Sequence, residues 1–152
     1  MHVFILFLEC LTVGTKVLAR WYRWRKQTTY VTGYVSEINE KTIGIVPHDQ
    51  HSSLTPGTVL MVSKSAPYYI LKDIVPQEHE IINRISVVML LRGQDGAAVY
   101  PSGKVVNKIG LWYQVNLDND EIGHWRKLSQ IRLLKIPNSC ETLENNKLEI
   151  KK

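Results

Sequence analysis

The sequence predicts an all-β protein made of two small barrels that pack together. Short apolar segments with a period of two follow one another along the chain, turn residues separate them, and the whole pattern occurs twice. Before the C-terminal tail only residues 77–84 have the pattern of a helical turn, so no helix of ordinary length is expected. Short strands with regular turns favour small barrels over a single sandwich.

The first predicted element is the apolar segment 1–11, which begins MHVFILFL. We interpret it as a buried strand or a non-native leader, with a signal peptide as the minor alternative, because it lacks the basic start and the small-residue cleavage pattern of a signal peptide. No later stretch approaches the roughly 20 apolar residues that cross a bilayer. The sequence therefore predicts a protein that has no membrane partner and is not secreted.

Residues 12–76 form the first predicted barrel. Its strands are VGTKVLARW, YVTGYVSEI and TIGIV, and the last two are separated by the turn residues Asn39, Glu40 and Lys41. A loop insertion is expected at about 51–66, where HSSLTPGT contains Ser, Pro and Gly.

A connector at 77–84 leads to the second predicted barrel, residues 85–135. Its strands are SVVMLLR, SGKVVNKI and LWYQVNL, with turns at GQDG and KIG, and the polar tail 136–152 follows them. We expect the barrels to share a packed interface, because units of about 50 to 60 residues are near the lower limit of independent stability. The connector also contains no flexible Gly/Ser run.

The two predicted barrels repeat one sequence pattern. Tyr30 and Gly33 match Tyr100 and Gly103, 70 positions later. Glycine inside a strand predicts a sharp bend at both places. A second stretch matches at an offset of 57, which places about 13 extra residues in the first barrel: Tyr68, Leu71 and Ile74 correspond to Trp125, Leu128 and Ile131.

The charge balance allows acidic partners without identifying one. There are 19 Lys and Arg against 14 Asp and Glu, a net charge of +5, which admits nucleic acid, a histone-bearing surface or anionic lipid. Cys10 and Cys140 lie far apart without paired-ligand spacing, so we expect neither a zinc site nor a disulfide scaffold. A reducing compartment is the expectation.

Motifs for catalysis are absent from the sequence. The cluster of His48, Asp49 and His51 is interpreted as a polar loop rather than a metal site, because it has no fixed third partner. The chain contains no Gly-rich phosphate loop and no Gly-x-Ser-x-Gly elbow. We therefore expect no enzyme, no metal and no cofactor.

The repeated motifs carry a resemblance to a known family. VGTKVLARW, YVTGYV and IVPHD in the first half, and YPSGKVV, LWYQVNLDND and LSQIRLL in the second, resemble the Tudor module. The resemblance covers roughly residues 12–76 and 85–135 and implies a tandem pair of Tudor-like, SH3-like barrels. Such modules are chromatin- or RNA-associated adaptors, so it also implies a modified peptide, plausibly a histone tail, as partner, and a nuclear location.

The resemblance places an aromatic cage on the first barrel. Ring faces hold a methylated ammonium with ~0.5–2 kcal/mol each, and a nearby carboxylate supplies charge. In the second barrel the large rings of Trp112, Tyr113 and Trp125 are expected to pack in the core or between the barrels. The cage candidates are Trp21, Tyr30 and Asp49, with Tyr22, Trp24 and Tyr34 as nearby alternatives.

Two other functions stay open. The segment RWYRWRK would bind RNA or DNA weakly if its cations neutralised phosphates while Tyr22 or Trp24 stacked on a base. Alternatively the protein is a structural adaptor, nuclear or cytoplasmic, that holds an unmodified protein in the groove between the barrels. In each case we expect a monomer or a part of a larger chain. The cations of the segment are Arg20, Arg23, Arg25 and Lys26.

Overall fold

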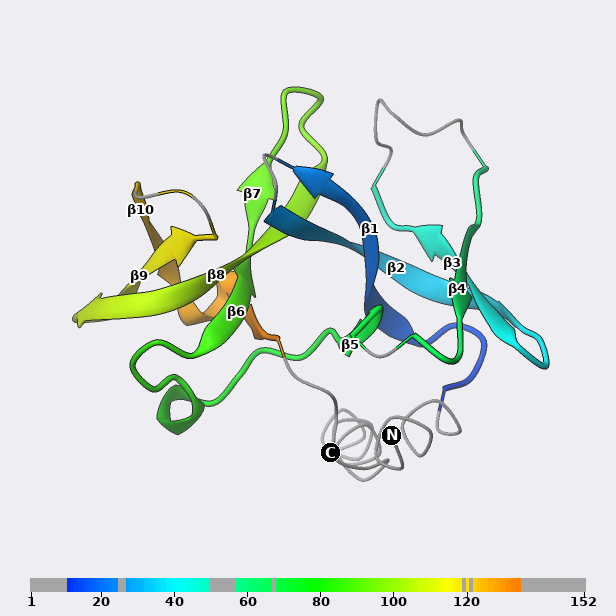
Figure 1. Cartoon of the computed structure of the whole chain (residues 1–152), viewed down its shortest axis with the longest axis horizontal. Coiled ribbons are helices and arrows are strands. Elements are labelled where there is room, and N and C mark those ends of the chain that lie inside the picture. The colour runs from blue at the N-terminus through cyan, green and yellow to red at the C-terminus, as the bar shows by residue number, and fades with distance from the viewer. Residues whose placement is uncertain are drawn as a thin grey trace, which may run out of the picture.

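The fold is built almost wholly from β-strands. The computed structural model describes residues 11–24, 27–49, 57–66, 68–118, 120 and 122–134, without the side chains of 22–24 and 27. In this part of the chain eleven strands and two one-turn 3₁₀ helices form (Figure 1). The prediction of an all-β fold is confirmed. The predicted N-terminal segment before Leu11, the first part of the predicted loop insertion and the predicted tail lie outside the described residues.

The first group of strands has a core of its own. β1 (Lys16–Trp24) pairs with β2 (Gln27–Ile38) and β5 (Ile70–Lys72), while β3 (Thr42–Pro47) joins β2 to β4 (Leu60–Ser63). The predicted strand end at Trp21 was wrong, because the hairpin with β2 supplies backbone partners as far as Trp24. The core cluster of this group consists of Leu11, Val17, Ala19, Val35, Ile43, Ile45, Val62 and Ile70.

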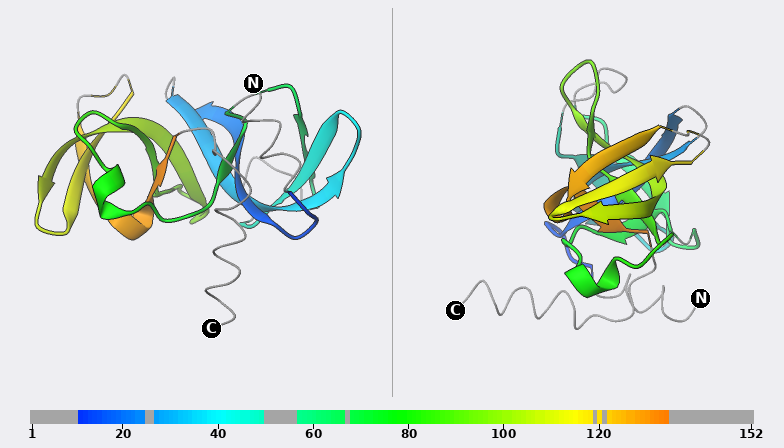
Figure 2. Two further views of the ribbon diagram at one scale, coloured as in Figure 1. Left: turned by 90° about the horizontal axis from the view of Figure 1, so that it is seen from below. Right: turned by 90° about the vertical axis from the view of Figure 1, so that its left-hand side faces the viewer.

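The second group lies beside the first along the long axis of the molecule (Figure 2). η1 (Glu78–Glu80) lies in the connector, and η2 (Leu128–Gln130) precedes the last strand. Closure of each group into a separate barrel stays a prediction. The strands are β6 (Ser86–Met89), β7 (Leu91–Arg92), β8 (Ala98–Ile109), β9 (Trp112–Leu117), β10 (Gly123–Lys127) and β11 (Ile131–Leu133). Their core cluster consists of Val87, Met89, Val105, Tyr113, Val115, Leu117 and Ile131.

The two groups repeat each other's strand register. A bulge falls at matching places, after Val35 in β2 and after Val105 in β8. The turn that precedes each group also repeats, since Gly14 and Arg84 both have a positive φ, 95° and 64°. Their N–H groups donate to the carbonyls of Val35 and Val105, each over 2.7 Å. One backbone pattern is therefore built twice from different side chains.

The register corrects the second sequence match. Ile70 lies opposite Ala19, and Ile131 lies opposite Met89, the residue that matches Ala19 in the second group. Ile70, not Ile74, is thus the counterpart of Ile131. The offset falls from 70 to 61, so the first group carries nine extra residues rather than 13. The sequence match relied on aromatic and leucine spacing, but Tyr68 lies in a loop and not in a strand.

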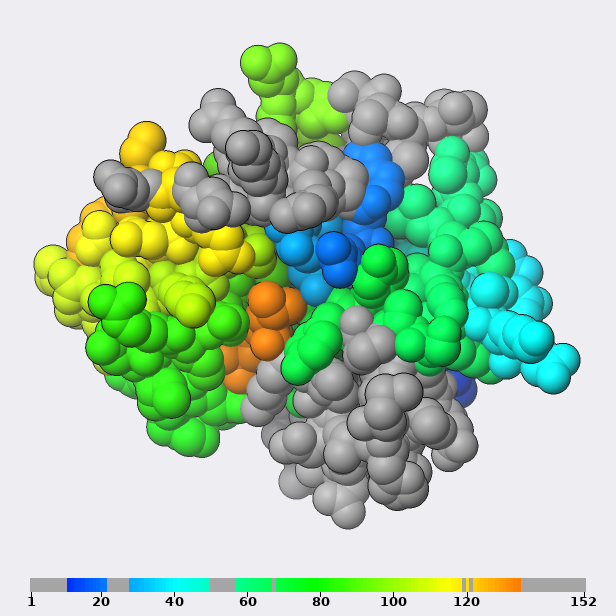
Figure 3. All heavy atoms as spheres, viewed as in Figure 1, coloured from blue at the N-terminus to red at the C-terminus, as the bar shows by residue number. Residues whose placement is uncertain are grey.

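β2 and β8 join the two groups. Tyr30 lies opposite Tyr100 in this antiparallel pair. Because these two tyrosines are matching residues, their pairing relates the groups by an approximate two-fold axis. The end of the described C-terminal segment, orange in the space-filling view, also lies between the groups (Figure 3). The apolar cluster that the groups share consists of Leu18, Tyr30, Leu71, Val88 and Tyr100, with Leu90 and Leu134 packed against it.

The shared cluster explains why β1 is buried on both faces. The alternation of the sequence predicts a half-buried strand, yet Val17 and Leu18 are only 1% and 0% exposed. Val17 belongs to the core of the first group, and Leu18 belongs to the cluster between the groups. The second group therefore covers the face that a single barrel would leave in water.

A buried carboxylate ties three elements together beside this cluster. Asp73, whose side chain is 2% exposed, follows β5 and accepts a hydrogen bond from Nε of Arg132 in β11 over 2.8 Å. Nζ of Lys16 in β1 lies 3.3 Å from its other oxygen. A buried carboxylate with two cationic partners is costly to leave alone, so all three groups fix the geometry of the junction.

The glycines of the two long strands permit a close approach of the next strand. A Cβ at Gly103 would lie 2.5 Å from the backbone oxygen of Asn116. We expect Gly103→Ala to lower the free energy of unfolding by about 2 kcal/mol, because backbone must move to admit the methyl group. Urea unfolding followed by circular dichroism measures this. Gly93→Ala is the control, because a Cβ there would lie 3.1 Å from a carboxylate oxygen of Asp95, a side-chain atom that can move aside. If both variants lose the same free energy of unfolding, the backbone clash at Gly103 is not the cause.

The buried and the exposed ion pairs should differ sharply in their effect on stability. Asp73→Ala leaves Arg132 and Lys16 without their carboxylate, and we expect a loss of about 3–5 kcal/mol in thermal or urea unfolding. Glu78→Ala breaks the exposed pair with Lys108, and we expect no measurable change. A fully stable Asp73→Ala variant would show that the junction does not depend on this carboxylate.

Candidate functional site

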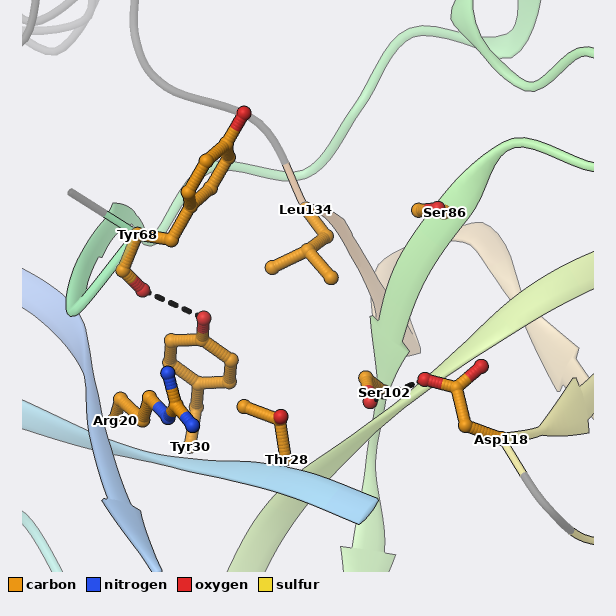
Figure 4. A pocket seen from close by; sticks show the side chains of 8 residues that line it. All are labelled: Arg20, Thr28, Tyr30, Tyr68, Ser86, Ser102, Asp118 and Leu134. Atoms are coloured by element: carbon orange, nitrogen blue, oxygen red, sulfur yellow. Dashed lines mark hydrogen bonds between the residues drawn. The ribbon is translucent and has the colours of Figure 1, made fainter. Parts of the chain in front are cut away.

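A pocket of about 330 Å³ opens between the two strand groups (Figure 4). Elements from both groups contribute to it, so it exists only because β2 and β8 pair. Its lining is mostly polar and contains one cation and one carboxylate. The lining residues are Arg20, Thr28, Tyr30, Tyr68, Ser86, Ser102, Asp118 and Leu134.

The wall from the first group is held by a tyrosine pair. The hydroxyl of Tyr30 donates to the carbonyl oxygen of Tyr68 over 2.6 Å. Tyr68 has a positive φ of 66°, which is unusual for a bulky residue, and its side chain is 45% exposed. The hydrogen bond helps to hold this backbone conformation, and the ring of Tyr68 stands at the rim (Figure 4).

Arg20 reaches the same wall from β1. Its guanidinium lies over the ring of Tyr69, 4.7 Å from the centroid. The backbone N–H of Arg20 donates to the backbone carbonyl of Tyr69 over 2.7 Å. These contacts bind the loop before β5 to β1. They also place a positive charge at one side of the pocket.

The wall from the second group carries the negative charge. The hydroxyl of Ser102 donates to Oδ2 of Asp118 over 2.7 Å, and the N–H of Asp118 donates to the carbonyl of Ser102 over 3.1 Å. This pair of bonds fixes the carboxylate at the end of β9. Figure 4 shows it across the pocket from Tyr68 and Arg20.

The electrostatics of the pocket keep one of its tyrosines protonated. Burial raises the pKa of the Tyr30 phenol well above its ordinary value, against the opposing effect of the Arg20 charge. Tyr30 therefore stays protonated at neutral pH and remains a hydrogen-bond donor. Among the described lining residues no His, Cys or Lys accompanies the hydroxyls as a base. What the pocket offers a ligand is hydrogen bonds, one charge of each sign and the exposed ring of Tyr68.

The structure does not bring together the predicted cage residues whose side chains it describes. Tyr30 is 1% exposed and belongs to the cluster between the groups, which corrects its expected role as a cage wall. Asp49 accepts a hydrogen bond from the N–H of Ala98 over 2.9 Å and lies 3.7 Å from Arg92. Its carboxylate therefore joins the second group instead of facing Tyr30.

The other two described rings, those of Trp21 and Tyr34, lie far apart. Tyr34 is 38% exposed and meets the ring of His48 edge-on at 5.6 Å. It lies opposite Lys16, five residues from Trp21 along β1, or about 16 Å in an extended strand. Trp21 is partly buried and occupies a bulge of β1 between Arg20 and Tyr22. One small cation cannot touch both Trp21 and Tyr34.

Several predicted residues fall outside this description. Arg25 and Lys26 are not among the described residues, and the same holds for the side chains of Tyr22, Arg23 and Trp24. Of the predicted nucleic-acid contacts, the structure places Arg20, which lines the pocket.

Sequence reasoning missed the rings that the structure exposes. Trp112 is 44% exposed, so its expected role in packing was wrong, whereas Tyr113 is 4% exposed and in the core as expected. The signal was Gly110, since apolar residues that flank a turn glycine lie at a hairpin tip. Tyr68 gave no such signal, because its exposure follows from the loop geometry.

Neither metal ligation nor a membrane span is found in the described part of the chain. No three His, Cys, Asp or Glu side chains gather there as a metal site would require. His51 of the histidine cluster is outside it. The same residues include no helix long and apolar enough to span a bilayer.

The comparisons with known proteins bear on the fold. No family model and no curated protein matches the sequence. Among solved structures, the chain is similar to a crystal structure of Arabidopsis thaliana AGDP1 AGD34, with 12% identity and a TM-score of 0.58 over 88% of this chain and 89% of that chain. At this identity the likeness shows the fold alone. It supports a Tudor-like, β-rich fold, as the resemblance implied, and the tandem arrangement stays a prediction.

The Tyr30 hydroxyl yields a test of the pocket wall. We expect Tyr30→Phe to lower the free energy of unfolding by about 1 kcal/mol, because the carbonyl of Tyr68 loses its donor. The raised pKa of Tyr30 also predicts a pH effect. The stability that the phenol provides is complete below its unfolded pKa of about 10 and is lost as pH rises above it. Between pH 8 and 11 the free energy of unfolding should therefore fall less steeply with pH in Tyr30→Phe than in the parent.

Tyr34→Phe is the matched control, since Tyr34 lies on the same strand with an exposed ring. A decline with pH that is identical in the parent and in Tyr30→Phe would contradict the assignment.

Proposed function

We propose that the chain is a non-catalytic binding module that holds a peptide in the pocket between its two strand groups, and that the peptide carries a methylated lysine or arginine, as a histone tail does. One observation carries the proposal: the exposed ring of Tyr68 and the carboxylate of Asp118 stand on facing walls of one polar pocket. A ligand of this kind would place the protein in the nucleus.

The two walls would bind different parts of the ligand. The negative charge of Asp118 attracts the ligand's cation, and the face of Tyr68 adds ~0.5–2 kcal/mol when a methylated ammonium lies against it. The charge of Arg20, which lies on the same wall as Tyr68, opposes that cation and lowers the affinity. Arg20 would donate instead to the peptide's carbonyl groups. With these opposing charges we expect dissociation constants of micromolar to millimolar order.

The methyl mark is the part of the proposal that the Tudor-like fold motivates. A mark of this kind needs more ring faces than Tyr68 alone. Trp21 is the further candidate, because it follows the pocket residue Arg20 and occupies a bulge, and bulges re-aim side chains from the strict alternation of a strand.

The test begins with an array of methylated and unmodified basic peptides, followed by titration of the best one by NMR or calorimetry. We expect Asp118→Asn to weaken binding about tenfold, because a carboxylate charge is lost while a hydrogen-bonding side chain of the same size remains. Tyr68→Ala should weaken it to a similar degree, and Trp21→Ala should remove the preference for the methylated form. Tyr34→Ala, an exposed tyrosine outside the pocket, is the control and should bind as the parent does.

The outcomes separate the alternatives. Equal binding by the parent, Asp118→Asn and Tyr68→Ala would rule out the pocket. A parent that binds methylated and unmodified peptides alike would favour the adaptor function. If a single-stranded RNA binds more tightly than every peptide, weakens with salt and depends on Arg20, the nucleic-acid function takes its place.

A further inference from the structure

A second, separate surface lies on the outer face of β8, β9 and β10, at the end of the molecule remote from β2 (Figure 1). Residues that lie opposite one another in adjacent strands project to the same face. Ile109 lies opposite Trp112, and Trp112 lies opposite Lys127. Trp125 is two residues before Lys127 and therefore shares the face, while Tyr113 points to the core.

An apolar pocket of about 360 Å³ opens on this face, lined by Ile109, Trp112 and Trp125. Ile109 is 63% and Trp112 is 44% exposed, and Leu111 at the hairpin tip is 78% exposed. A single exposed apolar side chain needs no explanation, but Ile109 and Trp112 line one pocket together with Trp125, and such a group marks a contact surface. The core of the second group lies on the other face and does not use them.

The charges around the pocket are of one sign. On this face Lys127 lies opposite Trp112 and Lys104 lies opposite Asn116, whereas Lys108 and Arg126 lie opposite the core residue Tyr113 and project to the other face. The sequences of the three strands include no Asp or Glu. Nζ of Lys127 lies over the ring of Trp112, 5.1 Å from its centroid. A ligand cation is therefore repelled from the ring that would otherwise attract it, and the site differs in this respect from the pocket beside Asp118.

We propose that this surface binds a peptide segment that carries a large apolar side chain flanked by Asp or Glu residues. The pocket between Ile109 and the two tryptophans receives the apolar side chain, since its lining offers little to a polar group. Lys127 beside Trp112 attracts the flanking carboxylates, and Lys104 adds a second positive charge on the same face. Two aliphatic residues at the tip, Ile109 and Leu111, suit an apolar partner better than a nucleic-acid strand, whose bases stack on rings.

The probe is a panel of synthetic ten-residue peptides, each with one central Phe, Leu or Trp among Asp and Glu residues. The matched control panel replaces every acidic residue by Lys. Binding to the full chain is followed by NMR through the indole N–H signals of the four tryptophans, which report which surface is engaged. We expect at least one acidic peptide to shift the signals of Trp112 and Trp125, and no Lys peptide to do so.

Substitutions then separate the two parts of the site. We expect Trp125→Ala and Ile109→Asp to weaken binding at least tenfold, and Lys127→Glu to weaken it about tenfold and to reduce its salt dependence. Ile109→Asp is included because Ile109 is exposed and outside the core, so this variant should fold even if Trp125→Ala does not. Tyr68→Ala alters the pocket between the groups and should leave this binding unchanged. The proposal for that pocket and the proposal for this surface can therefore be tested independently.

Three results would overturn the inference. If no acidic peptide shifts either indole signal at millimolar concentration, the surface is not a site of this kind. Binding of phosphatidylserine vesicles or of an oligouridine that Trp125→Ala abolishes, without peptide binding, would assign it to a lipid surface or to nucleic acid. Dimerisation of the parent that Ile109→Asp abolishes would assign it to a second copy of the chain.

Discussion

The antiparallel pairing of β2 with β8 is the constraint on which the rest of the structure depends. It places Tyr30 opposite Tyr100 and brings two groups of strands together, each with its own core. The contact buries the outer face of β1 and shields the carboxylate of Asp73 from water. The polar pocket opens beside this pairing and takes its charges from both sides, Arg20 from one group and Asp118 from the other. A single group would have half of that lining.

The two groups are alike in backbone and different in what they expose. The bulges after Val35 and Val105, and the left-handed turns at Gly14 and Arg84, are set by hydrogen bonds that any side chain permits, although Arg84 adopts its φ less readily than a glycine. Side chains at matching positions of the two groups can therefore differ in polarity without changing the backbone. The hairpin between β2 and β3 has the turn Asn39–Lys41, whereas the hairpin between β8 and β9 presents Leu111 and Trp112. The repeat therefore yields one charged pocket between the groups and one apolar pocket on the second group alone.

The contact between the groups decides where the site candidates named from the sequence lie. Arg20, which the sequence predicts as a nucleic-acid contact, lines the pocket, whereas Asp118 was not among the predicted site residues. Tyr30 and Asp49 had the right chemistry for a cage, but the ring became core and the carboxylate joined Ala98 and Arg92. Both changes have one cause, the contact between the groups, because a residue on the rim of an isolated unit is an interface residue once a second unit covers it. Periodicity within a segment contains no information about that contact.

The sequence by itself determined the strands, most of their turns and the two glycines that admit a close neighbouring strand, because these depend on local spacing and on the absence of a Cβ. It also determined that the pattern occurs twice, at an offset of 70 for β2 and β8. Only the tertiary structure decided which rings face solvent, how β5 and β11 correspond, and that Arg20 and Asp118 share one pocket. Burial and charge proximity depend on which distant strands meet, and that choice is made by the packing of the whole chain.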